Sequence, residues 1–426
     1  MRKLSAIAVA VVVALGCSNS RTATKSNAEA ATTSVPPLAS SVAQVEVDAA
    51  VEAAAPPEVL AGVDYAAEAK TLFRIAACGN TSSPVPDGFD AAVVDAHCKE
   101  LTAMIAEYKK SWMDVAMPFI AKLVPADTPK TVVYPFGGGD LLGALATYPN
   151  GTKITTISLE VAADVRKVDS IPKGRLAPEL ARYRMVLGKL FEKAHSRTDN
   201  LDIGSKSVLP GEIVFDLVAL AVHGYEPTSL RYFRFTADGS LHYFEQAEID
   251  GADAALKANK KTRAEIDDAF FSNMELRYRS TVADAVHVTR ILRHVAYNLD
   301  DTHMKQSPQL LKQLEGDGKI AAMTKAASHL LWSDDFSIIR NYLATHTDWM
   351  ISDSTGFAPT YAKKMGFVQD TYGTYTWPEP FGTVDVKNAT DLRNLFTANP
   401  HTDITFRYGY PDKDHHGHIV VTRKPK

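Results

Sequence analysis

The order of apolar and polar positions divides the chain into a short apolar run at the N-terminus, a polar stretch, and a long body in which helix and strand patterns alternate. The apolar run occupies residues 4–16 and follows Arg2 and Lys3. It is shorter than the roughly 20 apolar residues that a membrane-spanning helix needs. Residues 1–16 therefore predict a cleaved secretory signal peptide.

The end of this run, Ala14-Leu15-Gly16-Cys17, resembles the lipobox of bacterial lipoproteins, in which the cysteine is acylated and becomes the mature N-terminus. The order differs from the usual one, because Leu normally stands at the position of Ala14 and a small residue at that of Leu15. Plain secretion with cleavage at a nearby small residue is the alternative. The resemblance, with Ser18 instead of Asp after the cysteine, implies the outer membrane of a Gram-negative bacterium. Palmitate and other acyl chains on Cys17 would anchor the protein without spanning the membrane.

The polar stretch at residues 17–60 is rich in Ala, Ser, Thr, Glu and Pro and contains no aromatic residue. Such a segment cannot bury enough apolar surface to offset its ordering entropy, so it predicts a disordered tether. The remainder is long enough for one large domain or two modest ones. We expect a helical N-terminal part at residues 61–125 and an α/β body at residues 126–426.

Apolar residues recur at helical spacing near the start of the body. They are Leu101, Ile105, Tyr108, Trp112 and Val115. Spacings of three and four place them on one buried face of a helix, which we expect Pro118 and Pro125 to bound. An earlier helix is predicted over residues 65–77.

Two cysteines remain once Cys17 carries lipid, namely Cys78 and Cys98. An even pair in an exported chain predicts a structural disulfide, whereas a cytosolic location would favour a redox or metal role. The bridge would join the two predicted helices across the loop between them, which contains Pro and Gly.

Residues 131–160 carry the clearest strand–helix–strand pattern. A β-branched strand at residues 131–135 is followed by a glycine turn, a short helix capped by Asp140, and a second strand that leads to Glu160. A unit of this kind builds a parallel sheet. Antiparallel hairpins are predicted around Asp238-Gly239 and over residues 404–421. The expected fold class is therefore α/β, a Rossmann-like mostly parallel sheet with antiparallel hairpins and a helical N-terminal part.

The glycine turn allows two interpretations. Gly137 and Gly139 open a G-x-G-x-x-x-G arrangement, and Glu160 follows where an acid would hold the ribose of a nucleotide-like ligand or methyl donor. Against a ligand, the spacing is not the usual G-x-G-x-x-G, Pro135 interrupts the strand end, and nicotinamide and S-adenosylmethionine are not supplied outside the cytoplasmic membrane. The alternative is a tight strand-to-helix turn in which glycine supplies a positive φ, and we predict no cofactor.

A second strand followed by a loop is predicted at residues 348–353. Ligands bind at the carboxyl ends of parallel strands in such folds. The candidate ligand-binding residues are therefore Gly137, Gly139, Asp140, Glu160 and Asp353.

Other acidic residues have a chemical and a structural interpretation. Asp353 and the following Ser-Thr-Gly differ from the Asp-Thr/Ser-Gly of aspartic proteases by one inserted residue, so we reject a protease. Asp216 interrupts an apolar run at residues 213–222 that predicts a buried helix. It is either a satisfied core carboxylate or a group that faces a cavity.

The histidines do not predict a metal site. A helix is predicted over residues 282–303 with His287 and His294 on one face, and their seven-residue spacing separates the rings by roughly 10 Å, too far for one ion. His415, His416 and His418 lie in the predicted C-terminal hairpin, where histidines are more often solvated than metal-bound. We therefore assign no metal ligand and no catalytic residue.

Three short motifs resemble an uncharacterised family of exported bacterial proteins and lipoproteins. They are Tyr-Pro-Phe-Gly-Gly-Gly-Asp at residues 134–140, Ile-Arg-Asn-Tyr-Leu at residues 339–343, and Asp-Ser-Thr-Gly at residues 353–356. The resemblance implies an extracytoplasmic location and carries over no catalytic residue.

The composition limits the partners. A formal charge of −4 and the lack of any Lys/Arg-rich run argue against a nucleic-acid partner. The sequence predicts a lipid-anchored envelope protein whose α/β body binds a small molecule or an envelope protein. The alternative is an extracytoplasmic enzyme with a degenerate Rossmann-like, methyltransferase-like active-site region, since acids stand at two predicted strand ends beside glycine loops.

Overall fold

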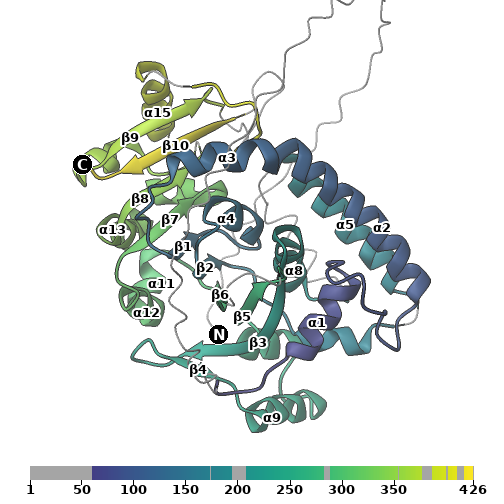
Figure 1. Cartoon of the computed structure of the whole chain (residues 1–426). Helices are drawn as coiled ribbons and strands as arrows, with labels where there is room; N and C mark the ends of the chain where they lie inside the picture. Colours follow the sequence, from purple (N-terminus) through teal and green to yellow (C-terminus); the bar gives the residue numbers. More distant parts are fainter. Residues whose placement is uncertain are drawn as a thin grey trace, which may run out of the picture. The chain divides into compact units, whose positions relative to one another are not determined.

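A computed structural model describes residues 60–172, 174–193, 208–282, 288–353, 355–376, 386–399, 402–409 and 417–425 (Figure 1). The predicted signal peptide, Cys17 and residues 17–59 of the predicted tether lie outside these ranges, as do His287, His415 and His416. Within the ranges, no helix combines the length and apolar character that crossing a membrane requires.

The described body begins with helices. They are α1 (Ala66–Ile75), α2 (Ala91–Tyr108), the π-helical turn η1 (Lys109–Met113) and α3 (Asp114–Leu123). The last three form one continuous run, visible in Figure 1 as a long helix that packs along α5 (Leu176–Lys193). Two details of the predicted helix are wrong, because Pro118 lies inside α3 and Val115 is exposed. Pro118 is the fifth residue of α3 and lies within five residues of the π-helical turn, where the regular hydrogen-bond ladder is already interrupted.

The described residues form a ten-stranded sheet in the order β4-β3-β5-β6-β2-β1-β7-β8-β10-β9. The five middle strands run parallel to one another. They are β6 (Arg290–Ala296), β2 (Lys153–Ser158), β1 (Thr131–Pro135), β7 (Ile320–Thr324) and β8 (Thr347–Ser352). The predicted α/β class is confirmed. Strands β2 to β6 all lie on one side of β1, and β7 to β10 lie on the other side. The strand order therefore reverses between β1 and β7, and this place is the topological switch point.

Antiparallel strands flank the parallel core. On one side lie β5 (Asn273–Ser280), β3 (Tyr225–Phe235) and β4 (Leu241–Tyr243), and β3 pairs with β4 as the predicted hairpin around Asp238-Gly239. On the other side β10 (His418–Arg423) lies between β8 and β9 (Val368–Gly373).

Two element predictions are wrong. The predicted C-terminal hairpin is absent from the described part of residues 404–421, where residues 404–409 contribute only a single bridge and β10 pairs with β8 and β9 instead. The helix predicted over residues 282–303 is contradicted by β6, so His294 lies on a strand. β6 lies between β5 and β2, the latter distant in the chain, and its own residues lack the alternating pattern that would distinguish a strand from a helix.

Helices cover both faces of the sheet. The face that carries Val132 and Tyr134 packs against α1, α4 (Leu141–Thr147), α5 and α8 (Gly211–His223). The face that carries Val133 and Ile157 packs against α11 (Asp301–Gln306), α12 (Gln309–Glu315), α13 (Ser337–His346) and α14 (Pro359–Lys364). Three further helices complete the described body: α9 (Gln246–Lys257), α10 (Arg263–Phe270) and α15 (Val386–Ala398).

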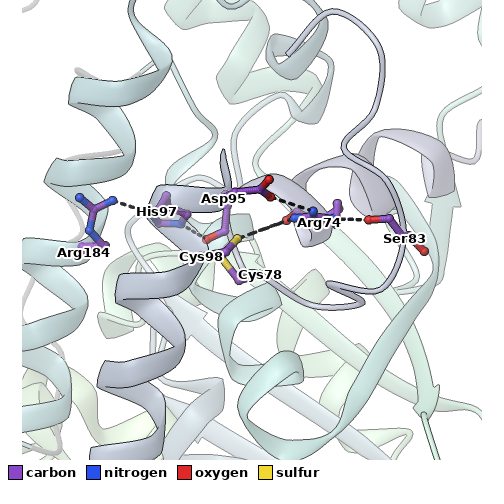
Figure 2. The surroundings of a disulfide bond; sticks show 8 residues. Arg74, Cys78, Ser83, Asp95, His97, Cys98 and Arg184 are labelled. Carbon is purple, nitrogen blue, oxygen red and sulfur yellow. Dashed lines mark hydrogen bonds and ion pairs between the residues drawn. A yellow bond between two sulfur atoms is a disulfide. The ribbon is translucent and has the colours of Figure 1, made fainter. Parts of the chain in front are cut away.

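A cysteine pair ties the end of α1 to α2 (Figure 2). The Sγ atoms of Cys78 and Cys98 lie 2.15 Å apart and their Cα atoms 5.3 Å apart. Arg74 lies beside them, with its Nη1 3.8 Å from Cys98 Sγ and its Nε donating to the Ser83 carbonyl at 2.9 Å. The two cysteines that the sequence pairs are therefore at bonding distance.

Candidate functional site

The candidate site lies at the carboxyl ends of the parallel strands, where folds of this kind bind ligands. Asp140 follows β1, Glu160 follows β2 and Asp353 follows β8. A fourth charged residue, Lys325, directly follows β7. The sequence analysis selected the three acids and missed the lysine.

The glycine turn after β1 packs against the protein itself. Gly138 has φ +45° and Phe136 has φ +61°, so the chain turns through the left-handed region. A Cβ on Gly137 would lie 2.5 Å from the ring of Tyr134. Gly139 is buried in the same turn. In the described structure these glycines therefore serve the turn and its contact with Tyr134.

Asp140 is buried and makes three contacts through its two carboxylate oxygens. Its Oδ1 accepts a 3.0 Å hydrogen bond from the backbone N–H of Gly143 as the N-cap of α4, as predicted. Its Oδ2 accepts a 2.9 Å hydrogen bond from the Tyr134 hydroxyl and lies 3.4 Å from Lys325 Nζ. Lys325 is also almost fully buried, and its Nζ lies 4.8 Å from the centre of the Tyr408 ring. A buried ion pair thus occupies the switch point.

Asp353 joins this group through Tyr408. Its Oδ1 accepts hydrogen bonds from the backbone N–H of Thr355 at 2.8 Å and from the Thr355 hydroxyl. Gly409 packs so closely that a Cβ there would lie 2.6 Å from Asp353 Cβ. Burial, together with the charges of Asp353 and Asp140, raises the pKa of the Tyr408 hydroxyl well above its usual value. Asp140, Lys325, Tyr134, Tyr408 and Asp353 therefore form one buried group, which we call the switch-point cluster.

Almost no free volume remains at the switch-point cluster. The cavity beside Asp140 and Lys325 has a volume of about 10 Å³, which is room for one water molecule. Trp112 from η1, Leu190 from α5 and Tyr408 close it. The helical N-terminal part thus covers the crevice in which a doubly wound fold usually holds its ligand.

Glu160 does not belong to the switch-point cluster. It lies at the end of β2, is partly exposed, and its carbonyl oxygen is 2.8 Å from His294 Nε2 on β6. Burial lowers the pKa of His294. The structure therefore brings Asp140 and Asp353 together and leaves Glu160 on the neighbouring strand.

A second group of acids lies on α8, beside Glu160. Glu212 and Asp216 stand four residues apart, both are almost fully buried, and none of their four carboxylate oxygens has a hydrogen-bond partner among the described residues. Burial raises the pKa of both well above the usual value. The charges of Asp216 and Glu160 add to the rise at Glu212, and that of Asp140 adds to the rise at Asp216. We call these two residues the carboxyl pair.

The sheet offers further polar atoms below α8. Thr156 on β2 pairs with His294 on β6. Both side chains lie on the face of the sheet that α8 covers, together with Ile154 and Leu292. The Thr156 hydroxyl and His294 Nδ1 are buried and have no hydrogen-bond partner in the described part of the chain. Buried polar groups without partners are uncommon in folded proteins and occur preferentially where ligands, ions or water bind.

The one group of possible metal ligands in the described ranges lies at the cysteine pair, not at the sheet edge. Cys78, His97 and Cys98 offer ligand atoms within 4.8 Å of one another. The sulfurs, however, are bonded to each other, and both ring nitrogens of His97 have partners. Arg184 Nη1 lies 2.7 Å from Nδ1 and can only donate, so Nε2 carries the proton and donates to the Ala76 carbonyl at 2.9 Å (Figure 2). This corner therefore holds helices together.

Two charged residues in these groups, Lys325 and Glu212, escaped the sequence analysis. Lys325 follows a short apolar run at residues 320–323 that is itself the signal of a buried strand, and a charge just after such a strand is a candidate by position. Glu212 stands one helical turn before Asp216, so helical spacing predicts that they share a face. Neither signal could show that the carboxyls lack partners.

Comparisons of the chain with protein-family models, with curated proteins and with solved structures gave no match in any of the three.

Proposed function

We propose that this protein is an exported, lipid-anchored binding protein of the bacterial envelope, held to the membrane through Cys17. The N-terminal sequence supports the anchor, since a short apolar run that ends in Gly-Cys resembles a lipobox. The α/β body then acts outside the cytoplasm, where a disulfide between Cys78 and Cys98 is stable.

One observation argues against both catalysis and ligand binding at the switch point, so the binding function belongs elsewhere on the body. The crevice at the switch point is filled by Trp112, Leu190 and Tyr408, and about 10 Å³ remains beside the Asp140–Lys325 ion pair. A substrate or methyl donor needs a pocket of several hundred Å³ at this edge. The charged residues at the switch point are thus already occupied by one another, as expected of a structural group.

The experiment is membrane fractionation combined with native mass spectrometry of the mature protein. We expect that Cys17 is the acylated N-terminus and that the protein carries a bound molecule or protein. Denaturation should release this partner without chemical change. Recovery of the protein in the soluble fraction without acylation would contradict the anchor. Release of a chemically converted molecule would contradict a pure binding role.

An extracytoplasmic enzyme is the second candidate, and the carboxyl pair favours it. Two buried carboxyls without partners cost folding free energy, and proteins retain such groups most often at functional sites. Their raised pKa values keep Glu212 and Asp216 protonated at higher pH than ordinary carboxyls, as a general acid requires. If Glu212→Gln and Asp216→Asn abolish a measurable turnover while binding is retained, the enzyme is the better description.

A further inference from the structure

A ligand-sized cleft lies at the opposite edge of the sheet, where β1, β2 and β6 begin. Its volume is about 690 Å³, well within the range of small-molecule sites. Its walls come from the loop after α3, the loop between α4 and β2, and the start of β6. The residues that matter for the argument are Val124, Pro125, Lys130, Pro149, Val288 and Arg290. We call this space the amino-edge cleft.

The charge in the amino-edge cleft is of one sign. Among the described lining residues, Lys130 and Arg290 are cationic and none is acidic, although the formal charge of the chain is −4. Lys130 is exposed, and its ammonium group makes no hydrogen bond or ion pair with the part of the chain that the structure describes. An anionic group is therefore the complementary ligand.

Arg290 is held in place before any ligand arrives. Its Nη1 donates to the carbonyls of Pro149 at 2.7 Å and Gly151 at 2.6 Å, and its Cζ lies 5.1 Å from the centre of the Tyr225 ring. Its Nε and Nη2 have no partner among the described residues, and this edge of a guanidinium matches a carboxylate or phosphate with two parallel hydrogen bonds. A group fixed in advance loses little entropy on binding.

Backbone carbonyls at this edge would repel an anion, because α3 and α4 both end there. Three carbonyls of the loop after α4 are engaged, however. The Tyr148 carbonyl accepts a 2.9 Å hydrogen bond from the Gly151 N–H, and Arg290 covers the carbonyls of Pro149 and Gly151. These contacts reduce the repulsion that an anion bound to Arg290 and Lys130 would meet from the backbone.

Part of the wall is apolar, and threonines and Asn150 line the remainder. Val124 and Pro125 line the cleft beside Val288, which is 42% exposed. An exposed apolar side chain next to two cations fits a ligand with an acidic head and an apolar body better than a free inorganic anion.

We propose that the amino-edge cleft binds a small amphiphilic acid, a carboxylate or phosphate ester on an apolar body. The acid group bonds to Arg290 Nε and Nη2 and to Lys130, and the apolar body lies against Val124, Pro125 and Val288. This assignment gives the ligand class and the place for the binding function proposed above, and it rests on that function.

The test is calorimetric titration of the full-length lipidated protein in a non-ionic detergent with octanoate, octyl phosphate, octylamine, octanol and inorganic phosphate. We expect saturable binding of at least one of the two octyl acids, and at least tenfold weaker binding of the amine, the alcohol and inorganic phosphate. Preference between the two acids assigns the head group. Absence of binding by both acids, or equal binding of the amine, the alcohol or inorganic phosphate, overturns the proposal.

Variants locate the site. Lys130→Gln and Arg290→Lys should each weaken acid binding about tenfold or more, because the first removes a charge and the second removes the paired hydrogen bonds of the guanidinium. Arg279→Gln is the matched control, since Arg279 is a half-exposed arginine on β5 paired with Glu226. Lys130→Gln keeps the test open if Arg290→Lys disturbs the loop. Unchanged affinity in the Lys130 variant would place the ligand elsewhere.

The outcome separates this assignment from the function on which it rests. A native mass spectrum with a bound basic or neutral molecule would overturn the acid assignment and leave the binding function standing. A spectrum with no bound molecule and no bound protein would overturn the binding function.

Discussion

At the residue scale, the switch-point cluster shows how a predicted ligand site can become part of the core. Asp140 caps the N-terminus of α4, accepts a hydrogen bond from the Tyr134 hydroxyl and pairs with Lys325. Each of its carboxylate oxygens therefore has a protein partner. A buried ion pair adds little net stability compared with apolar residues of the same shape, but removal of one partner leaves an uncompensated charge.

Replacement of Asp140 tests this account. Asp140→Asn should lower the free energy of unfolding by about 3–5 kcal/mol, because Lys325 then keeps a buried charge without its carboxylate. Urea unfolding measures the change. Asp348→Asn is the control, since Asp348 and its partner Lys319 are both more than half exposed, and it should change stability by less than about 1 kcal/mol. Equal effects of the two variants would mean that the buried pair is not formed.

The carboxyl pair predicts an unusual pH dependence. The pKa of Glu212 is raised in the folded protein, so between its usual value of 4.5 and the raised value the folded state binds more protons than the unfolded state. The stability that the protonated form provides is complete below pH 4.5 and is lost as pH rises through the folded pKa, at up to about 1.4 kcal/mol per pH unit.

Glu212→Gln removes this loss, because glutamine does not ionise. The variant should therefore gain stability over the unmodified protein as pH rises from 5 to 8 in urea titrations. Glu107→Gln, at an exposed position of α2, is the control and should follow the unmodified protein. Parallel curves for Glu212→Gln and the unmodified protein would show that Glu212 is not a buried, unpaired acid.

At the element scale, the first strand–turn–helix unit depends on one close contact. A Cβ at Gly137 would lie 2.5 Å from Tyr134 Cγ, and the Tyr134 ring is itself buried and bonded to Asp140. Gly137→Ala should destabilise the protein by about 1–3 kcal/mol, the usual effect of overpacking a core. Thermal unfolding measures it. Gly251→Ala is the control, because a Cβ there meets no atom within 4 Å, and it should not destabilise α9.

The cysteine pair that joins α1 to α2 leads to another prediction. The cysteine pair closes a loop with a sequence separation of 20, so Cys78→Ser combined with Cys98→Ser should lower the free energy of unfolding by about 3 kcal/mol. Addition of reductant to the unmodified protein should produce a similar loss, and the double variant should not respond to reductant. A reductant effect that persists in the double variant would assign the loss to another cause.

Local patterns predicted local elements. Residues 131–160 gave a strand, a turn, a helix and a strand that match β1, α4 and β2, because the β-branched runs, the glycines and the Asp140 cap all lie within a few residues of each other. The apolar run at residues 213–222, which Asp216 interrupts, likewise predicted α8.

Predictions failed where distant chain segments decide the structure. The sequence predicts a helix at β6 because pairing with β5 and with the distant strand β2, not a local pattern, makes this segment a strand. β10 pairs with β8 and β9, and no local signal at residues 418–423 specifies these partners. The same reason hides the carboxyl pair, since Glu212 and Asp216 differ from ordinary helix acids only through what packs over them.

At the scale of the whole molecule, the sequence predicts two parts with different tasks. Residues 59–426 form one compact unit with its own core on each face of the sheet. The N-terminal sequence contains the predicted signal peptide and the proposed anchor at Cys17. The body should therefore fold and bind without the anchor, while the anchor should determine the location.

Cys17→Ser tests this separation. The variant lacks the thiol that lipid modification requires, so it should leave the membrane fraction and appear in the soluble extracytoplasmic fraction with its unfolding transition unchanged. Fractionation followed by circular dichroism measures both properties. Retention of the variant in the membrane would assign the anchoring to another segment.

The most direct test of the central claim is a native mass spectrum of the mature protein extracted gently from its own membranes. We predict an acylated chain that begins at Cys17 and carries an additional mass, which is released intact on denaturation and is reduced in the Lys130→Gln variant. A chain without acylation and without any bound molecule or protein would contradict the account of a lipid-anchored binding protein.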